Sequence, residues 1–183
     1  MRLFFAFPIP SEKRNELRGQ LDPVVSASSG IRWTNADSFH ITAHFLGEVP
    51  PAGLERLRAV MRGFVPSVAP VSAEYAGIGR FPPRGRASVI VVPVTKNGEK
   101  LGSLQREIGD RISGVFPLDT RRYTPHITVG RARNHETPSL VIPDGVRVSG
   151  CFAVSSFVLF SSDLRPGGPV YAPVFEIPLT GGA

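Results

Sequence analysis

The chain has 183 residues, of which 42% are hydrophobic and 20% are charged, a balance typical of a folded domain with its own core. No apolar run approaches the roughly 18 residues that a membrane span needs, so we expect no membrane association. The formal net charge of +6 and the pI near 10.2 leave two alternatives, an anionic partner, because a positive field attracts phosphates, or a charge that mainly serves solubility.

The first half of the chain predicts three strands and two helices. Residues 2–9 are almost continuously apolar, as in a strand that is buried on both faces. Ser11 is placed to cap the helix that follows. The predicted order is strand, helix, strand, strand and helix, over residues 2–9, 12–21, 31–34, 39–49 and 54–64.

The second half predicts one helix among strands. The helix covers residues 97–112, and the strands cover residues 71–81, 87–94, 123–133, 151–162 and 170–179. The last two strands flank the turn sequence Arg-Pro-Gly-Gly-Pro, which favours an antiparallel pair. Strands and helices do not alternate regularly, as a doubly wound parallel sheet requires, so the predicted class is α+β.

One triplet, His-Ile-Thr, occurs twice, at residues 40–42 and 126–128, once in each half of the chain. Each copy lies on a predicted strand, and no low-complexity linker separates the halves. We therefore expect one domain over residues 1–183, built of two pseudo-symmetric lobes. Each lobe would be an antiparallel sheet with helices, and an active-site groove would lie between them.

The two triplets predict a catalytic face. Side chains at i and i+2 of a strand share a face, so His40 and Thr42 project together, as do His126 and Thr128. Two imidazoles can act as acid and base on a phosphodiester, with a rate maximum near neutral pH, while threonine hydroxyls hold the non-bridging oxygens. A single His-x-Thr strand is commonplace, but two copies favour a functional site over core packing.

Neither a metal nor another cofactor is expected. Two separate imidazoles without a carboxylate at ligand spacing make a poor zinc site, because catalytic zinc usually takes three protein ligands. The single cysteine, Cys151, excludes an intramolecular disulfide and a cysteine-rich zinc site. It is compatible with a reducing cytoplasm, where we expect the protein, and we expect its thiol to be buried.

The two remaining histidines receive no catalytic role. His44 continues the alternation of His40 and Thr42, which leaves two alternatives, a residue that lines the groove or a half-exposed, solvated side chain. His135 lies in a polar loop, where a surface position is the simplest interpretation. The glycines of "GIGRFPPRG" lack the Lys and Ser/Thr of a phosphate-binding P-loop.

Four segments together resemble one known family. They are "RLFFAFPIP", "FHITAHFLGEV", "PHITVGRAR" and "VLFSSDLRPGGPVY", in that order from the first strand to the last hairpin. They resemble the 2H phosphoesterases, and "FLGEV" and "GGPVY" are similar to its branch of RNA 2′,3′-cyclic phosphodiesterases, also called 2′-5′ RNA ligases. The resemblance implies a two-lobed α+β fold and hydrolysis of an RNA 2′,3′-cyclic phosphate to a 2′-phosphate. It also implies joining of certain RNA ends through a 2′-5′ linkage.

The same resemblance implies a role for each residue of the triplets. His40 would donate a proton to the departing 3′ oxygen, and His126 would accept a proton from the attacking water. Thr42 and Thr128 would hold the phosphate. The residues themselves do not distinguish the two histidines as acid and base.

Three arginines are candidates for contact with the substrate. Arg131 occupies a position where the family commonly has arginine, although strict alternation puts it on the face opposite His126 unless Gly130 introduces a bulge. Arg84 and Arg86 lie in the loop "FPPRGR", where they either contact the RNA backbone or are simply solvated.

Two other functions remain open. One is a phosphoesterase of the same superfamily that acts on small cyclic nucleotides, ADP-ribose cyclic phosphate or 2′-5′ oligonucleotides. The other is a non-catalytic protein that binds RNA ends. In either case we expect RNA ends or cyclic nucleotides as partners, and a monomeric chain.

Overall fold

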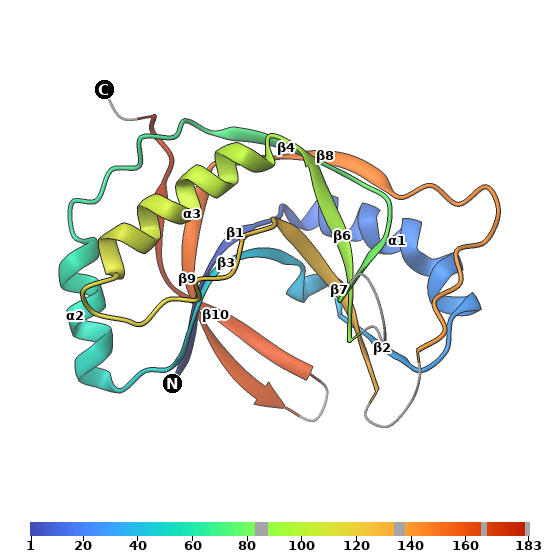
Figure 1. Cartoon of the computed structure of the whole chain (residues 1–183), viewed down its shortest axis with the longest axis horizontal. Coiled ribbons are helices and arrows are strands. Elements are labelled where there is room, and N and C mark those ends of the chain that lie inside the picture. Colours follow the sequence, from blue (N-terminus) through green and yellow to red (C-terminus); the bar gives the residue numbers. More distant parts are fainter. Residues whose placement is uncertain (83–87, 134–137, 166–167, 182–183) are drawn as a thin grey trace.

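The computed structural model describes residues 1–82, 88–133, 138–165 and 168–181 and has the predicted α+β architecture (Figure 1). Its strands are β1 (Arg2–Pro8), β2 (Ile31–Trp33), β3 (His40–Glu48), β4 (Val71–Ala76), β5 (Gly79–Phe81), β6 (Val89–Lys96), β7 (His126–Ala132), β8 (Ser149–Val154), β9 (Ser156–Arg165) and β10 (Gly168–Pro178). Its helices are α1 (Ser11–Ala27), α2 (Pro51–Met61) and α3 (Gly98–Ile112), with a 3-10 turn η1 (Ala36–Ser38). Within the described ranges, no helix is both long and apolar enough to cross a membrane.

The strands form one antiparallel sheet in the order β10-β9-β1-β3-β7-β6-β4-β8, with β2 paired to β7 and β5 to β6. The first lobe contains β10, β9, β1 and β3, and the second contains β7, β6, β4, β8, β2 and β5. The lobes join where β3 meets β7, through a single residue pair, Ile41 and Ile127. Figure 1 shows the β9–β10 hairpin and the β6–β7 pair diverging below this junction as two arms.

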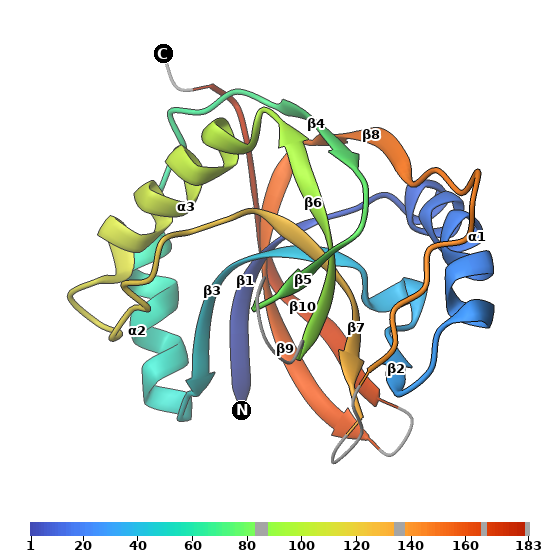
Figure 2. The ribbon, with the colours of Figure 1, turned by 45° about the vertical axis from the view of Figure 1, so that its right-hand side comes forward.

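The helices tie the two halves of the chain together. The α1 helix contacts β8, where the Gln20 side-chain amide donates to Ser149 O over 2.9 Å and accepts from Ser149 N–H over 3.0 Å. The α3 helix contacts β3 and lies beside α2, on the opposite side of the molecule from α1 (Figure 2). Each half of the sequence therefore contributes a helix that packs against a strand of the other half.

Buried apolar residues explain why these segments adopt these elements. Leu3 to Phe7 of β1 are all at most 2% exposed, which confirms a strand buried on both faces. On α3, every fourth or third residue is fully buried, which confirms its helical periodicity: Leu101, Leu104, Ile108 and Ile112. Both lobes contribute to one continuous core cluster that includes Ile41 and Ile127.

The N-terminal helix differs from the prediction at both ends. It begins after Pro10 with no side-chain cap, and Ser11 is its first residue and not its cap. It also continues to Ala27 and includes Pro23, a residue that local propensity places outside a helix. Burial of Val24 holds this last part of the helix against the protein, and such packing outweighs intrinsic propensity.

Two predicted strands are each divided in the structure. Residues 71–81 form β4 and β5, separated at Gly77, whose φ of 76° is a turn conformation that glycine adopts readily. Residues 151–162 fall on β8 and β9, because β8 pairs with β4 and β9 pairs with β1 and β10. The chain thus crosses from the second lobe to the first at Ser155. The predicted antiparallel pair at the C-terminus is confirmed as β9 and β10.

The prediction of a buried cysteine thiol is wrong. Cys151 lies on β8, where Phe152 and Val154 point into the core. Because successive side chains of a strand point to opposite faces, Cys151 is turned outward and is exposed.

Candidate active site

The junction of the lobes places both His-Ile-Thr triplets together. Ile41 and Ile127 pair directly and are both fully buried, so their neighbours point to the other face of the sheet. Because β3 and β7 are antiparallel, His40 lies toward Thr128, and Thr42 lies toward His126. All four side chains are half-buried. The face that carries them is called the histidine face below.

The two imidazoles are held in the same way. The Nδ1–H of His40 donates to Ser38 O over 2.7 Å, and the Nδ1–H of His126 donates to Thr124 O, also over 2.7 Å. A carbonyl oxygen can only accept, so Nδ1 carries the proton in each ring. This leaves Nε2 of each imidazole to gain or lose a proton at the histidine face.

The surroundings of the two imidazoles differ. His40 packs against two aromatic rings that also contact each other, with its centroid 5.0 Å from that of Phe4 and 5.2 Å from that of Tyr171. Its Nε2 is 3.0 Å from the Thr42 hydroxyl oxygen. Among the described residues, His126 has one such neighbour, Phe81 of β5, at 5.1 Å. The first imidazole is therefore the more enclosed of the two.

Burial and nearby positive charge depress both histidine pKa values. The pKa of His40 is lowered to about 4, mainly by burial and then by the positive charges of His126 and Arg131, with the hydrogen bond to Ser38 opposing. The pKa of His126 is also lowered, mainly by burial and then by Arg131, with the bond to Thr124 opposing. Both shifts favour the neutral imidazole at pH 7.

A β-bulge turns Arg131 toward the histidine face. Along the β6–β7 ladder Val91 opposes Thr128 but Ile90 opposes Gly130, so Val129 is an extra residue on β7. One extra residue shifts the alternation of the following side chains by one place. Arg131 therefore shares a face with Thr128, although strict alternation in the sequence places it opposite. Its influence on the pKa of both His40 and His126 agrees with this position.

A matching bulge in β3 turns His44 away from the histidine face. Phe5 opposes His44 but Ala6 opposes Thr42, so Ala43 is the extra residue here. His44 is only 6% exposed and donates from Nε2–H to Gln105 O of α3 over 2.7 Å. Both alternatives drawn from the sequence, a groove residue and a solvated one, are wrong, because each assumed an unbroken alternation.

Phe45 is the counterpart of Arg131. Phe45 has the same separation in sequence from His40 as Arg131 has from His126, and each lies beyond the bulge of its strand. Phe45 therefore lies on the histidine face in the first lobe, as Arg131 does in the second. Phe45 is 65% exposed, and its ring centroid lies 5.7 Å from that of Phe4. The histidine face therefore has an aromatic side and a cationic side.

Comparison with known proteins identifies the family. Residues 5–164 match the model of the 2′-5′ RNA ligase superfamily. The chain belongs to this superfamily. A relative from Methanothermobacter thermautotrophicus, named RNA 2′,3′-cyclic phosphodiesterase, is 29% identical over 93% of the chain and 95% of its own length. One of the same name from Geobacillus stearothermophilus is 30% identical over 97% of the chain, which spans 57% of that relative.

Comparison with solved structures confirms the two-lobed fold. The protein TT0787 of Thermus thermophilus is 27% identical and superposes with a TM-score of 0.80 over the whole of both chains. E. coli LigT, solved in complex with 3′-AMP, is 25% identical and has a TM-score of 0.78 over 98% of each chain. The predicted resemblance to the 2H phosphoesterases and the α+β class are thereby confirmed.

Several residues border the site that the sequence analysis did not predict. Phe4, Phe81 and Tyr171 contact the imidazoles, and the Tyr123 hydroxyl donates to Thr42 O over 3.0 Å, joining the loop before β7 to β3. Aromatic residues on strands ordinarily signal a core. Only the pairing of distant strands reveals that these rings surround the histidines.

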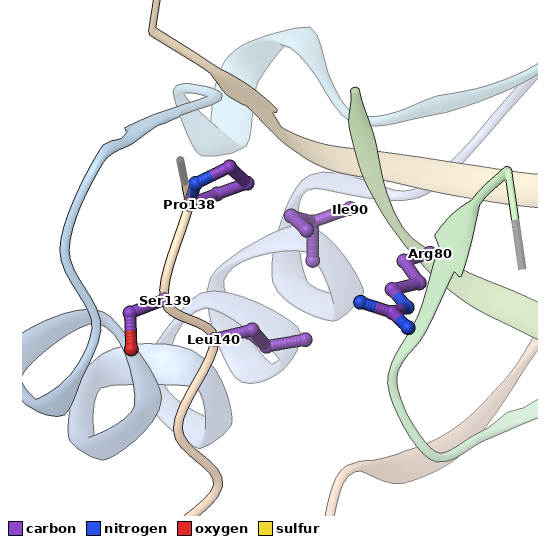
Figure 3. A pocket seen from close by; sticks show the side chains of 5 residues that line it. All are labelled: Arg80, Ile90, Pro138, Ser139 and Leu140. Atoms are coloured by element: carbon purple, nitrogen blue, oxygen red, sulfur yellow. The ribbon is translucent and has the colours of Figure 1, made fainter. Parts of the chain in front are cut away.

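The remaining candidate residues and the pocket of the second lobe complete the account of the sequence predictions. Arg84, Arg86 and His135 lie outside the described residues. A pocket of about 430 Å³ is lined by Arg80, Ile90, Pro138, Ser139 and Leu140 (Figure 3). Phe81, the neighbour of Arg80, points to His126, so Arg80 and the pocket lie on the opposite face of the sheet.

Proposed function

We propose that the chain is an RNA 2′,3′-cyclic phosphodiesterase that opens a terminal cyclic phosphate to a 2′-phosphate by metal-independent acid–base catalysis. The observation that carries the proposal is the pair of imidazoles on one face, each with Nδ1 fixed and Nε2 available. The names of the relatives support the same substrate. We also propose a single domain over residues 1–183 that acts as a monomer in the reducing cytoplasm, to which a free thiol is suited.

The reaction is a displacement at phosphorus with one proton accepted and one donated. Nε2 of His126 takes a proton from water as the water oxygen bonds to phosphorus. The bond from phosphorus to the 3′ oxygen breaks, and Nε2–H of His40 gives its proton to that oxygen. The products are a 2′-phosphate and a 3′-hydroxyl, and exchange with solvent returns the histidines to their starting states. When the 5′-hydroxyl of another RNA replaces water, the same steps form a 2′-5′ linkage.

Three side chains stabilise the charge that develops on the non-bridging oxygens. The hydroxyls of Thr42 and Thr128 donate hydrogen bonds to them, and the guanidinium of Arg131 neutralises their negative charge. Arg131 is suited to this role because its planar donors match phosphate oxygens.

The low pKa of His40 sets a condition on its role as the acid. With a pKa of about 4, an empty site holds very little protonated His40 at neutral pH. A bound phosphate diester is negatively charged, and the charge grows as the water attacks. Both effects raise the pKa of the adjacent imidazole, so the substrate itself prepares the acid. The choice of His40 as the acid rests on the family resemblance.

One incubation tests this function. The purified protein is mixed with an RNA oligonucleotide that ends in a 2′,3′-cyclic phosphate, in EDTA, and the 2′- and 3′-phosphate products are resolved. We expect the 2′-phosphate alone, formed at the same rate without EDTA. Absence of any product from the wild-type protein, or full activity in both His40→Ala and His126→Ala, would overturn the proposal.

The two alternative functions give different results in the same assay. A phosphoesterase for small substrates would turn over cyclic mononucleotides, ADP-ribose cyclic phosphate or 2′-5′ oligonucleotides faster than RNA ends. A non-catalytic RNA-end-binding protein would show salt-sensitive RNA affinity that survives loss of His40. The presence of both threonines beside the histidines favours catalysis, since binding alone is better served by arginine.

A further inference from the structure

The first lobe presents a row of aromatic rings that begins at His40. The row, called the aromatic strip here, consists of Phe4, Phe45, Phe160 and Tyr171. Phe4 is its centre, with ring centroids 5.7 Å from Phe45, 5.5 Å from Phe160 and 4.9 Å from Tyr171. These rings come from four neighbouring strands, β1, β3, β9 and β10, on the histidine face.

The strip is separate from the core. Phe4 is 2% exposed but lies outside the continuous core cluster, because it is covered by the other rings of the strip and by His40. Phe45 is 65% exposed, although it lies on a central strand. A large exposed ring packed against a buried one is an arrangement suited to contact with a further ring.

In-line displacement decides which part of the substrate meets the strip. The attacking water and the departing 3′ oxygen lie on opposite sides of phosphorus. The 3′ oxygen remains part of the terminal ribose, and the rest of the RNA is attached to that ribose. The ribose and the RNA strand therefore lie on the side of the acid, His40, and the strip begins at His40.

We propose that the strip stacks nucleobases of the RNA strand that ends in the cyclic phosphate, with Phe45 as its exposed platform. The proposal rests on the proposed function and names the part of the substrate that this side of the site recognises. Stacking on aromatic rings is tolerant of sequence, because every base has a π-face. The site would therefore accept RNA ends of different sequence and bind them better than a cyclic mononucleotide.

Positive charge beside the strip suits the phosphates that link those bases. Arg2 of β1 and Tyr171 of β10 both oppose Ser162 of β9, so Arg2 lies on the face of the strip. There it also forms an ion pair with Glu48 over 3.8 Å. Arg131 lies on the histidine face from β7. Basic groups alternating with aromatic rings are the usual features of a surface that binds single-stranded nucleic acid. Phe45 is the best ring to test, because it contacts Phe4 and is separated by it from His40.

Steady-state kinetics of Phe45→Ala test the proposal on two substrates with the same terminal nucleotide, a short RNA with a 2′,3′-cyclic phosphate and the cyclic mononucleotide. We expect KM for the RNA to rise about 10-fold with kcat unchanged, and no change for the mononucleotide. Phe45→Trp should retain the wild-type KM. Val65→Ala removes a side chain of similar exposure, 61%, from the loop after α2 and should change neither substrate.

Other outcomes overturn the proposal or the function separately. An unchanged KM for the RNA, or an equal rise for both substrates, overturns the role of the strip while turnover continues. If Phe45→Ala instead leaves KM unchanged and converts a dimer to a monomer in sedimentation, the strip is an interface between copies. Absence of turnover by the wild type overturns the proposed function, and binding of a 2′-phosphate-ended RNA to wild type and Phe45→Ala then decides whether the strip holds RNA.

Discussion

The strands β3 and β7 are alike up to the bulge and different after it. Each presents a histidine and a threonine to one face, fixes its imidazole through Nδ1 and a carbonyl two residues earlier, and carries a bulge after the threonine. The residue that the bulge then turns to the histidine face is Phe45 in one strand and Arg131 in the other. In the proposed function, the shared part would supply proton transfer, and the differing part would give the substrate a direction across the site.

The largest expected effect on kcat/KM comes from removing either of the two histidines that the strands share. His40→Ala and His126→Ala should each lower kcat/KM by at least about 10²-fold, because each removes a proton-transfer group. The double variant should be little worse than either single one, since the two act as a unit. Circular dichroism and thermal melting should show a folded protein in each case. If only one of the two variants lost activity, the histidine of the other lobe would not take part in proton transfer.

A substrate with sulfur in place of the 3′ oxygen should separate the two roles. A thiolate leaves without a proton, so His40→Ala should recover to within roughly 10-fold of the wild-type rate on this substrate. His126→Ala should stay slow, because the water must still be activated. The opposite pattern would exchange acid and base and would place the RNA strand on the side of Arg131.

Loss of the Arg131 guanidinium should have the next largest effect on kcat/KM. Arg131→Ala should lower kcat/KM by about 10²-fold, as when one charge-stabilising donor is removed from a transition state. The pKa of both histidines should rise, because Arg131 lowers each of them in the native protein. Arg56→Ala, on the exposed face of α2, is the matched control and should leave activity unchanged. A wild-type rate in Arg131→Ala would show that the phosphate does not bind beside Arg131.

The pH dependence should report the asymmetry of the two imidazoles. Activity of the free enzyme needs protonated His40, whose pKa is about 4, and neutral His126, whose pKa is below 6.5. The plot of kcat/KM should therefore peak on the acid side of 6.5 and fall as pH rises further. The plot of kcat, measured with the anion bound, should peak closer to neutrality. Coincident optima for both quantities would show that substrate does not raise the pKa of His40.

The sequence was sufficient for the triplets and their shared face, because alternation along a strand is a local property. Beyond each triplet simple alternation failed. It misplaced His44, whereas for Arg131 the sequence allowed a bulge at Gly130, and the structure has one at the neighbouring Val129. No residue type marks Ala43 or Val129 as a bulge, and a bulge reverses the face of everything that follows. The rings around His40 could not be found either, since Phe4 and Tyr171 reach it only through the pairing of β1, β3, β9 and β10. Strand order is decided by the whole chain and not by any one segment.

The smallest expected effect on activity comes from His44, which the bulge in β3 removes from the site. His44→Leu should leave kcat/KM nearly unchanged and lower the free energy of unfolding by roughly 1–2 kcal/mol, through loss of the hydrogen bond to Gln105 O. Burial lowers the pKa of His44, so the unfolded chain binds a proton that the folded protein does not, and wild-type stability falls as pH drops below 6.5. Denaturant unfolding at several pH values should show this slope in the wild type and a shallower one in His44→Leu. His44→Gln, which keeps a side-chain N–H donor, is the matched control, and a large loss of activity in a folded His44 variant would return this residue to the site.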